Sequence, residues 1–406
     1  MPYLQNKIKE LAKQYFNEVV SIRRHLHQNP ELSFEEYQTA AFVKEKLDVL
    51  GISYESMANT GVVGLIVGEK PSDKVLALRA DMDALPIQEV EGRVYGSQNE
   101  GVMHACGHDV HTSSLLGVAH ILQSLRSEFG GTIKLIFQPG EERLPGGASI
   151  MIKEGVLQNP APQGIIGQHV MPFIEAGKVG FRSGKYMASC DELFMTVKGK
   201  GGHGAHPHQN IDPIAITAQI ITALQQVVSR QADPRTPTVL SWGKIVGNGA
   251  TNIIPDEVYL EGTFRTFDEN WRGEAHQKMV KMAVGIAESM GATCDFEVRK
   301  GYPFLINEAK ITASSRKAAV EYLGEENVLE LDIWPAAEDF SYYSQETNAC
   351  FYRLGTGNKA KGIYSAVHTP TFDIDEQALE LSIGLMSYIA LKQLESSLNP
   401  SKGGGY

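Results

Sequence analysis

Hydrophobic residues in the first 170 positions form three short runs that are apolar almost throughout, at residues 75–80, 133–137 and 164–167. Strands that are covered on both faces of a sheet have this character. Apolar residues at helical spacing predict a helix over about 112–126, between the first two runs. We therefore expect an α/β domain in which strands alternate with helical segments.

Polar residues follow each of the three runs. Asp81-Met82-Asp83 follows the first run, Gln138-Pro139-Gly140-Glu141-Glu142 the second, and Gln168-His169 the third. In open α/β sheets, binding sites are built at the carboxyl ends of the strands. Because core packing does not require polar clusters at three strand ends, we expect these residues to line one cleft.

Two helices are predicted before the first strand. Leu4, Ile8 and Leu11 follow a helical spacing near the start of the chain. The sequence Ser33-Phe34-Glu35-Glu36 has the form of a capping box, so the second helix is predicted to begin there and to end near Gly51.

The pattern changes at about residue 187. Strands at 192–198, 239–244, 257–265 and 293–298 and helices at about 213–228 and 269–291 give the order β-α-β-β-α-β, that of a ferredoxin-like sandwich. The α/β character resumes after about residue 302. We therefore predict a domain of residues 187–302 inserted between 1–186 and 303–398, with a disordered tail at 399–406.

Composition narrows the possible partners. The chain has 406 residues, a net charge of −11 and no block of basic residues, which argues against nucleic-acid and anionic-membrane partners. No stretch approaches 18 uninterrupted apolar residues, so no membrane span is expected. The four cysteines lie far apart, which suits a reducing compartment, and we expect a cytoplasmic protein.

The run from Met103 to His111 carries the strongest chemical signal. It holds three histidines, a cysteine and an aspartate, with Gly107 between Cys106 and His108. Soft and borderline ligands this close together are typical of a transition-metal site. Taken alone, the run also fits a His-rich surface turn with an inert cysteine, or a Cys106–His108 redox or nucleophilic pair without metal.

The adjacent Glu141 and Glu142 suit a division of labour at such a site. Neighbouring side chains on an extended backbone point in opposite directions, so the two carboxylates are not expected to bind one ion in the same way. One can ligate a metal while the other accepts a proton from water. Spacing alone does not decide which residue has which role.

Five motifs in order resemble a known family. They are residues 78–86 around Asp81 and Asp83, His104–His108, Gln138–Glu142, Gly201-Gly202-His203 and His368-Thr369-Pro370. Together they are similar to the aminoacylase and carboxypeptidase G family of di-metal amidohydrolases, in the branch of hippurate hydrolases, auxin-conjugate hydrolases and N-acyl-amino-acid deacylases. The resemblance covers essentially the whole chain.

The resemblance implies a mixed-sheet α/β metallohydrolase domain with an inserted ferredoxin-like α+β domain that acts as a lid and in dimerisation. It implies two divalent metal ions, zinc or manganese and alternatively cobalt or nickel, with the Cys106 thiolate bridging them. The implied metal ligands are Cys106, His108, Glu142, His169 and His368.

The resemblance also implies roles near these ligands. Glu141 would be the general base, and Asp83 is expected to assist catalysis by orienting a ligand. One position departs from other branches of the family, because Asp81 stands where they carry a metal-binding histidine. The role of Asp81 is therefore open.

Three residues of the inserted domain are implied to bind substrate. His203 resembles a histidine that reaches a neighbouring subunit's site and stabilises the oxyanion, and Asn252 resembles a second polar group acting there. Arg265 is expected to bind the substrate carboxylate, which an Arg fork suits. These roles imply a homodimer through the inserted domain.

The function expected from the resemblance is hydrolysis of the amide bond of N-acyl amino acids, such as N-acetyl or N-benzoyl compounds. A carboxypeptidase or dipeptidase using the same site is the alternative among hydrolases. From other classes, a metal-independent Cys106 thiol enzyme and a catalytically inactive binding protein remain as hypotheses.

Overall fold

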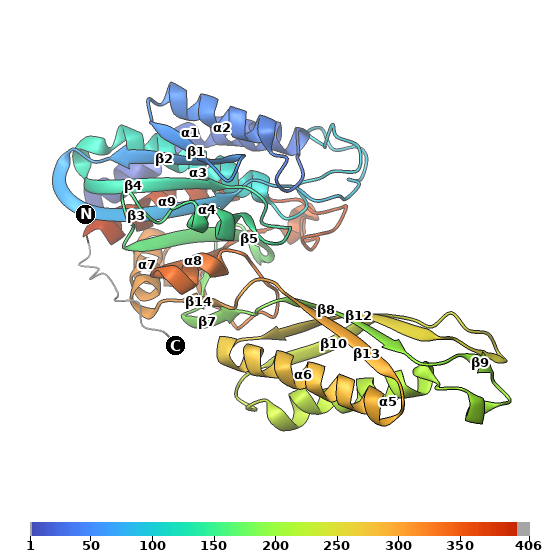
Figure 1. The fold of residues 1–406 in the computed structure, drawn as a ribbon. Helices are drawn as coiled ribbons and strands as arrows, with labels where there is room; N and C mark the ends of the chain where they lie inside the picture. Colours follow the sequence, from blue (N-terminus) through green and yellow to red (C-terminus); the bar gives the residue numbers. More distant parts are fainter. Residues whose placement is uncertain (1, 396–406) are drawn as a thin grey trace. The chain divides into compact units, whose positions relative to one another are not determined.

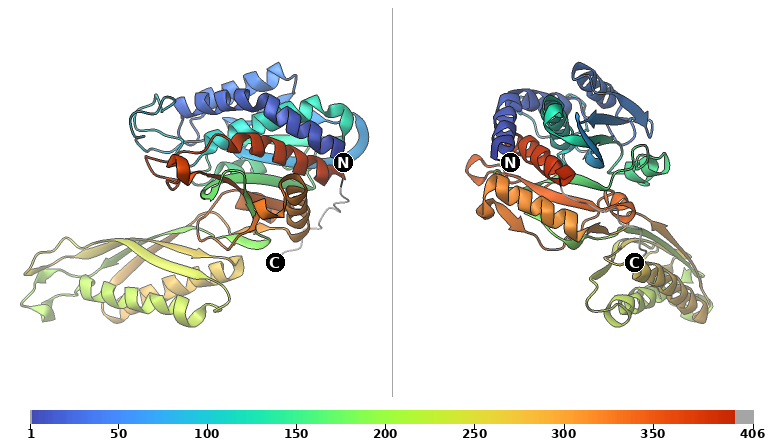
Figure 2. Two further views of the ribbon diagram at one scale, coloured as in Figure 1. Left: turned by 180° about the vertical axis from the view of Figure 1, so that it is seen from behind. Right: turned by 90° about the vertical axis from the view of Figure 1, so that its left-hand side faces the viewer.

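The structure is a computed structural model that describes residues 2–395 (Figures 1 and 2). It divides into two units. The larger contains the chain up to Gly184, Ile306–Asp332 and the chain from Asp339 onward, and the smaller contains Lys185–Leu305 and Ile333–Glu338. The hydrophobic pattern predicted residues 333–338 as part of the larger domain, but the structure places them in the smaller unit. The predicted disordered tail, 399–406, lies outside the described residues.

A mixed eight-stranded sheet forms the centre of the larger unit, as predicted for its fold class. The strand order is β1-β2-β4-β3-β5-β16-β6-β15. Strands β4, β3, β5 and β16 are parallel, whereas β1, β2 and β6 run antiparallel to neighbours. The strands are β1 (Tyr54–Met57), β2 (Gly61–Val67), β3 (Lys70–Asp81), β4 (Gly130–Gln138), β5 (Gly164–Glu175), β6 (Val179–Phe181), β15 (Val328–Glu330) and β16 (Ala349–Gly357).

Helices cover both faces of this sheet, which explains its nearly continuous apolar strands. The main core joins one face of the sheet to α1 (Pro2–Gln28), α2 (Tyr37–Val49), α3 (His108–Ser124), α7 (Ala309–Leu323) and α9 (Ala378–Glu395). Helices α4 (Gly147–Lys153) and α8 (Ser341–Glu346) lie on the other face, in front of the sheet in Figure 1. The left view of Figure 2 shows α1 and α9 from behind.

The strand register brings the predicted polar residues to one edge of the sheet. Asp81, the last residue of β3, pairs with Gln138, the last residue of β4. Strand β5 was expected to end near Gly167, but it continues to Glu175. Because Arg79 pairs with Gly167, His169 lies within β5 at the level of Asp81.

The capping-box prediction for the second helix is wrong. Helix α2 begins at Tyr37, and the N-cap residue before it, Glu36, makes no side-chain capping hydrogen bond. The Ser33 hydroxyl instead donates to Asp83 Oδ2 at 2.6 Å, and the Glu36 carboxylate accepts the backbone N–H of Gly140 at 2.8 Å. Both side chains therefore bind the edge of the sheet where the polar residues gather.

The smaller unit is a ferredoxin-like sandwich, as predicted. Its four-stranded sheet has the order β10-β12-β8-β13, and every neighbouring pair is antiparallel. Asp212 caps the first helix by accepting N–H groups of Ile214 and Ala215. The elements are β8 (Asp191–Lys198), β9 (Gly202–His203), α5 (Pro213–Gln226), β10 (Thr238–Val246), β11 (Ile253–Ile254), β12 (Glu257–Thr266), α6 (Glu269–Ser289) and β13 (Thr293–Lys300). Strands β7 (Gly184–Met187) and β14 (Leu305–Asn307) pair with each other.

A buried ion pair anchors helix α6 to the first strand of this sandwich. Asp191 and Arg272 are both fully buried, and Arg272 Nε donates to Asp191 Oδ2 at 3.0 Å. His276 Nε2 lies 2.6 Å from the same oxygen, and the Gly301 N–H donates to Asp191 Oδ1 at 3.1 Å. Burial raises the pKa of Asp191, but the hydrogen bonds to His276 and Arg272 lower it below its ordinary value.

Removing this carboxylate should destabilise the smaller unit strongly. The variant Asp191→Ala removes the fully buried carboxylate partner of Arg272 and leaves the guanidinium only the half-buried Glu269 carboxylate, a change that costs up to about 3–5 kcal/mol. Urea unfolding should show this as a lower midpoint. The matched control is Asp295→Ala, which removes the exposed pair with Lys198 in the same sheet and should leave the midpoint nearly unchanged. Equal shifts for both variants would contradict the assignment.

Candidate metal centre

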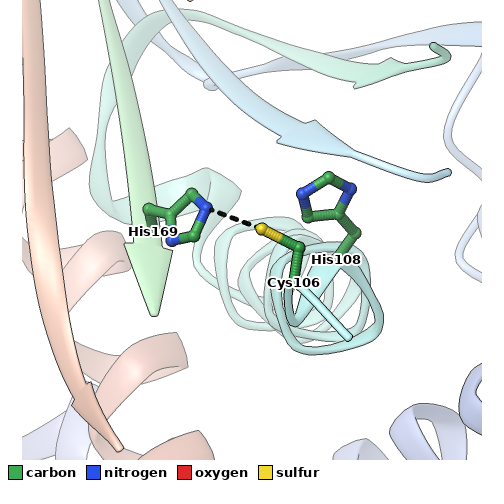
Figure 3. Close-up of side chains that lie close together, drawn as sticks. All are labelled: Cys106, His108 and His169. Carbon is green, nitrogen blue, oxygen red and sulfur yellow. Dashed lines mark hydrogen bonds between the residues drawn. The ribbon is translucent and has the colours of Figure 1, made fainter. Parts of the chain in front are cut away.

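Cys106 and His108 are placed by the turn that begins helix α3. Gly107 stands between them with φ 81°, in the left-handed region that favours glycine, and His108 is the first residue of the helix. A Cβ at position 107 would lie 2.6 Å from Val170 Cγ2, so the turn also packs closely against β5. Cys106 points toward His169 on β5, and the His108 ring lies on the other side of Cys106 (Figure 3).

Two overlapping groups of potential ligands share Cys106. The first joins Cys106, His108 and His169, and Cys106 Sγ lies 3.4 Å from His169 Nε2 (Figure 3). The second joins Cys106, Glu142 and His368. Here His368 Nε2 lies 3.3 Å from Cys106 Sγ and 3.1 Å from Glu142 Oε1. The structure thus brings together all five residues that the resemblance implies as metal ligands.

The chemistry of this cluster fits metal ions. His108 Nε2 is buried without a hydrogen-bond partner. Burying a polar atom without a hydrogen-bond partner destabilises the fold by about 1–3 kcal/mol, so such an atom indicates that a ligand binds there. A thiol, imidazoles and a carboxylate are the donors that zinc and related transition metals bind. The structure therefore supports a site for two metal ions in which Cys106 is common to both groups.

The electrostatics of Cys106 argue against a metal-independent thiol enzyme. Burial and the carboxylates of Glu142, Glu141 and Asp81 raise the pKa of the Cys106 thiol well above its ordinary value. Reactive cysteines have a lowered pKa, because the thiolate is the nucleophile. A cation bound at Cys106 would offset both effects and favour the thiolate form.

Asp83 connects two of the predicted ligands. Its Oδ1 lies 3.1 Å from His108 Nδ1, and its Oδ2 accepts the backbone N–H of Glu142 at 2.9 Å. The Ser33 hydroxyl donates to the same Oδ2. Because Nδ1 of His108 is bound in this way, Nε2 is the nitrogen that faces Cys106 and Glu142. The position of Asp83 is that of a residue that orients ligands.

Asp81 occupies a similar supporting position, next to the part of β5 that carries His169. Arg79 Nη1 donates to Asp81 Oδ2 at 2.6 Å, and His111 Nδ1 lies 2.6 Å from Asp81 Oδ1. His111 Nε2 accepts the backbone N–H of Val170 at 2.9 Å. Asp81 therefore acts through His111 on the backbone next to His169.

Glu141 is buried and contacts a residue that the sequence analysis missed. Its Oε1 accepts the backbone N–H of Asp339 at 3.3 Å. The Asp339 carboxylate in turn accepts Arg79 Nη2 and Gln138 Nε2, each at 2.8 Å. Adjacent acids such as Glu338-Asp339 on a loop usually face solvent, so no local signal in the sequence identified Asp339.

The three substrate-binding residues predicted in the smaller unit do not form one cluster. His203 and Asn252 are exposed and adjacent, since Ile253 pairs with His203 and the Gly204 N–H donates to Asn252 O at 2.9 Å. Arg265 lies near the far end of β12, eight positions from the first residue of that strand, and donates to Pro335 O at 3.1 Å. Contacts of these three residues with substrate stay a prediction.

The mixed α/β fold and the paired ligand groups are those of a dinuclear metal hydrolase. Residues 77–392 match the model of Peptidase family M20/M25/M40, and the chain belongs to this family. This confirms the family inferred from the motifs. Among residues 2–395, no helix is long and apolar enough to cross a membrane.

Three similar proteins illustrate the range of the family. An N-acyl-L-amino acid amidohydrolase of Geobacillus stearothermophilus is 46% identical over 75% of this chain and 81% of its own. Thermostable carboxypeptidase 2 of Saccharolobus solfataricus is 39% identical over 96% of this chain and 98% of its own. A dinuclear metal binding peptidase of the M20 family from Bacillus subtilis has a TM-score of 0.81 and 34% identity, covering 94% of this chain and 99% of its own.

Loss of the Asp83 carboxylate should weaken metal binding without unfolding the chain. Asp83→Ala frees the His108 ring and the Glu142 backbone, and loss of such supporting contacts typically lowers metal affinity about 10–100-fold. Competition with a chromophoric chelator measures this affinity. The control Asp48→Ala removes an exposed carboxylate that accepts the Tyr54 hydroxyl, and this variant should bind metal as the unaltered chain does. Unchanged affinity of Asp83→Ala would contradict the role.

Metal binding should release protons and strengthen as the pH rises. Burial lowers the pKa of His108, but Asp81 and Asp83 outweigh it and raise that pKa to about 10, while the Cys106 pKa is also raised. Both groups are therefore protonated at neutral pH without metal and must lose protons to bind it. Calorimetric titrations of the metal-free chain in buffers of different ionisation enthalpy measure this release. Affinity independent of pH between 6 and 8 would contradict it.

Proposed function

We propose that this chain is a metal-dependent amidohydrolase that cleaves N-acyl amino acids to a carboxylic acid and a free amino acid. The observation that carries the proposal is the Cys106 thiol shared by two ligand groups beside the buried Glu141. Membership of the peptidase family and the 46% identity to an N-acyl-L-amino acid amidohydrolase support it.

In this proposal Cys106, His108, Glu142, His169 and His368 hold two divalent ions. Zinc or manganese suits this donor set best, with cobalt or nickel as alternatives. The ions would supply Lewis-acid polarisation of the amide carbonyl and would lower the pKa of water. The 3.1 Å separation of Glu142 Oε1 from His368 Nε2 supports Glu142 as the ligand of the acidic pair.

Glu141 then acts as the general base. Its carboxylate accepts a proton from the attacking water and transfers it to the amide nitrogen, which leaves as an amine. The hydrogen bond from the Asp339 N–H holds one carboxylate oxygen, and burial excludes bulk water from it. Asp83 supports this step by orienting His108 and the backbone of Glu142.

The smaller unit would bind the substrate. His203 would stabilise the developing oxyanion and Asn252, its neighbour, would act with it on the site of a second subunit, which implies a homodimer through residues 187–302. The Arg265 guanidinium would pair with the substrate carboxylate. All four cysteines are free, which supports a cytoplasmic location.

A second candidate function is carboxypeptidase or dipeptidase activity at the same site. The 39% identity to a thermostable carboxypeptidase favours it. A panel of acetyl-, benzoyl- and indolylacetyl-amino acids against dipeptides separates the two functions. Higher kcat/KM for the acyl-amino acids supports the amidohydrolase, and higher values for the dipeptides support the alternative.

The variant Glu141→Gln tests the assignment of the base. It should retain both metal ions by elemental analysis and lose turnover by roughly 10²–10⁴-fold, because the amide cannot accept the proton. The neighbouring variant Glu142→Gln is the matched control and should lose metal. If Glu141→Gln keeps its activity, or if Glu142→Gln keeps its metal and Glu141→Gln does not, the two roles are wrongly assigned.

A further inference from the structure

Two buried carboxylates hold the backbone of the acidic loop, defined as residues 139–142. The Glu142 N–H donates to Asp83 Oδ2 at 2.9 Å, and the Gly140 N–H donates to Glu36 Oε1 at 2.8 Å. Glu141 is the residue between these two bound amides. Glu36 lies 104 positions before Gly140 and is fully buried.

The remaining contacts of Glu36 fix its carboxylate firmly. Its Oε1 also accepts the Phe34 N–H at 2.9 Å, and its Oε2 accepts the Thr60 hydroxyl at 2.7 Å. Phe34 has φ 68°, an uncommon value for a residue other than glycine. The hydrogen bond to Glu36 therefore helps to hold Phe34 in this conformation.

The Phe34 ring lies directly against the acidic loop. A Cβ at position 140 would lie 2.3 Å from Phe34 Cε1, so only glycine fits beneath the ring. Gly140 itself has φ 58°, in the left-handed region. Glu36 thus binds both sides of this contact, through the N–H of Phe34 and the N–H of Gly140.

Burying Glu36 has no evident benefit for helix α2. The residue stands at the N-terminus of the helix but makes no capping hydrogen bond with its side chain. Burial and the nearby Asp83 charge raise its pKa to about 7, which reflects the cost of placing a carboxylate there. Helix capping does not offset that cost. The hydrogen bonds from Gly140, Phe34 and Thr60 do, and the one from Gly140 ties the carboxylate to the acidic loop.

We propose that Glu36 is a positioning residue for Glu141, holding the acidic loop so that the Glu141 carboxylate meets the substrate in one orientation. This inference rests on the proposed role of Glu141 as general base. Glu36 does not contact the five potential ligands within the described residues, so it should act on proton transfer rather than on metal binding.

The first test compares Glu36→Ala with Glu36→Gln. Glu36→Ala should lower kcat about 10–100-fold with KM and metal content unchanged, because a small displacement of a catalytic group has effects of this size. Glu36→Gln should restore kcat to within about threefold. Its amide oxygen can still accept the N–H groups of Gly140 and Phe34, and its NH₂ group can donate to Thr60. If Glu36→Ala does not fold, Glu36→Asp replaces it, since the shorter side chain keeps the charge but does not reach Gly140.

Glu31→Ala is the matched control. The Glu31 carboxylate binds the N–H groups of Gln38 and Thr39 at the start of the same helix but does not contact the acidic loop. This variant should lower the unfolding midpoint while leaving kcat per folded, metal-loaded subunit unchanged. An equal loss of kcat in Glu31→Ala would show that any disturbance of α2 suffices, and would overturn the proposal.

A double variant separates positioning from general structural damage. If Glu36 acts through Glu141, adding Glu36→Ala to Glu141→Gln should change the residual kcat by less than about twofold. The inference would be overturned if Glu36→Ala lowered kcat by the same factor in the unaltered chain and in Glu141→Gln. Full activity of Glu36→Ala alone would also overturn it. Full activity of Glu141→Gln would instead overturn the proposed base, so the two failures are distinguishable.

Discussion

The position of the Cys106 thiol between two histidines is the constraint on which the rest of the larger unit depends. Its sulfur lies 3.4 Å from His169 Nε2 and 3.3 Å from His368 Nε2, and these histidines come from segments about 200 residues apart. Burying a thiol, imidazoles and carboxylates together is costly unless cations satisfy them. The parallel strands, the turn at Gly107 and the register of β5 all serve to place these donors within reach of one another.

A surrounding set of buried polar residues keeps the donors in place. Asp83 holds His108 and the Glu142 backbone, Asp81 acts through His111 on the backbone beside His169, and Glu36 holds Gly140. Such supporting contacts determine which nitrogen of a histidine faces the site. The site is therefore a network in which carboxylates fix the backbone as well as the side chains.

Local patterns predicted most of the fold, and they failed where a side chain is bound by a distant segment. The apolar runs identified the buried strands, and the spacing beyond residue 187 identified the ferredoxin-like unit with its Asp212 cap. The capping box predicted at Ser33 was wrong because both of its side chains bind distant groups instead of the helix. The Ser33 hydroxyl donates to Asp83, and the Glu36 carboxylate accepts the Gly140 N–H. The end of β5 was misplaced because the parallel neighbour β16 extends the ladder through polar residues.

The sequence by itself determined the class of site, because ligand-forming residues follow successive apolar strands and their order matches a known family. The resemblance to that family also predicted five metal ligands, and the structure brings these five residues together. Only the tertiary structure decided that Asp81 contacts His111, that Asp339 contacts Arg79 and that Glu36 contacts Gly140. These partners lie 30, 260 and 104 positions away in the chain. The physical reason is that an acidic residue looks solvated in sequence, and only the fold shows that it is buried against a backbone N–H or a guanidinium.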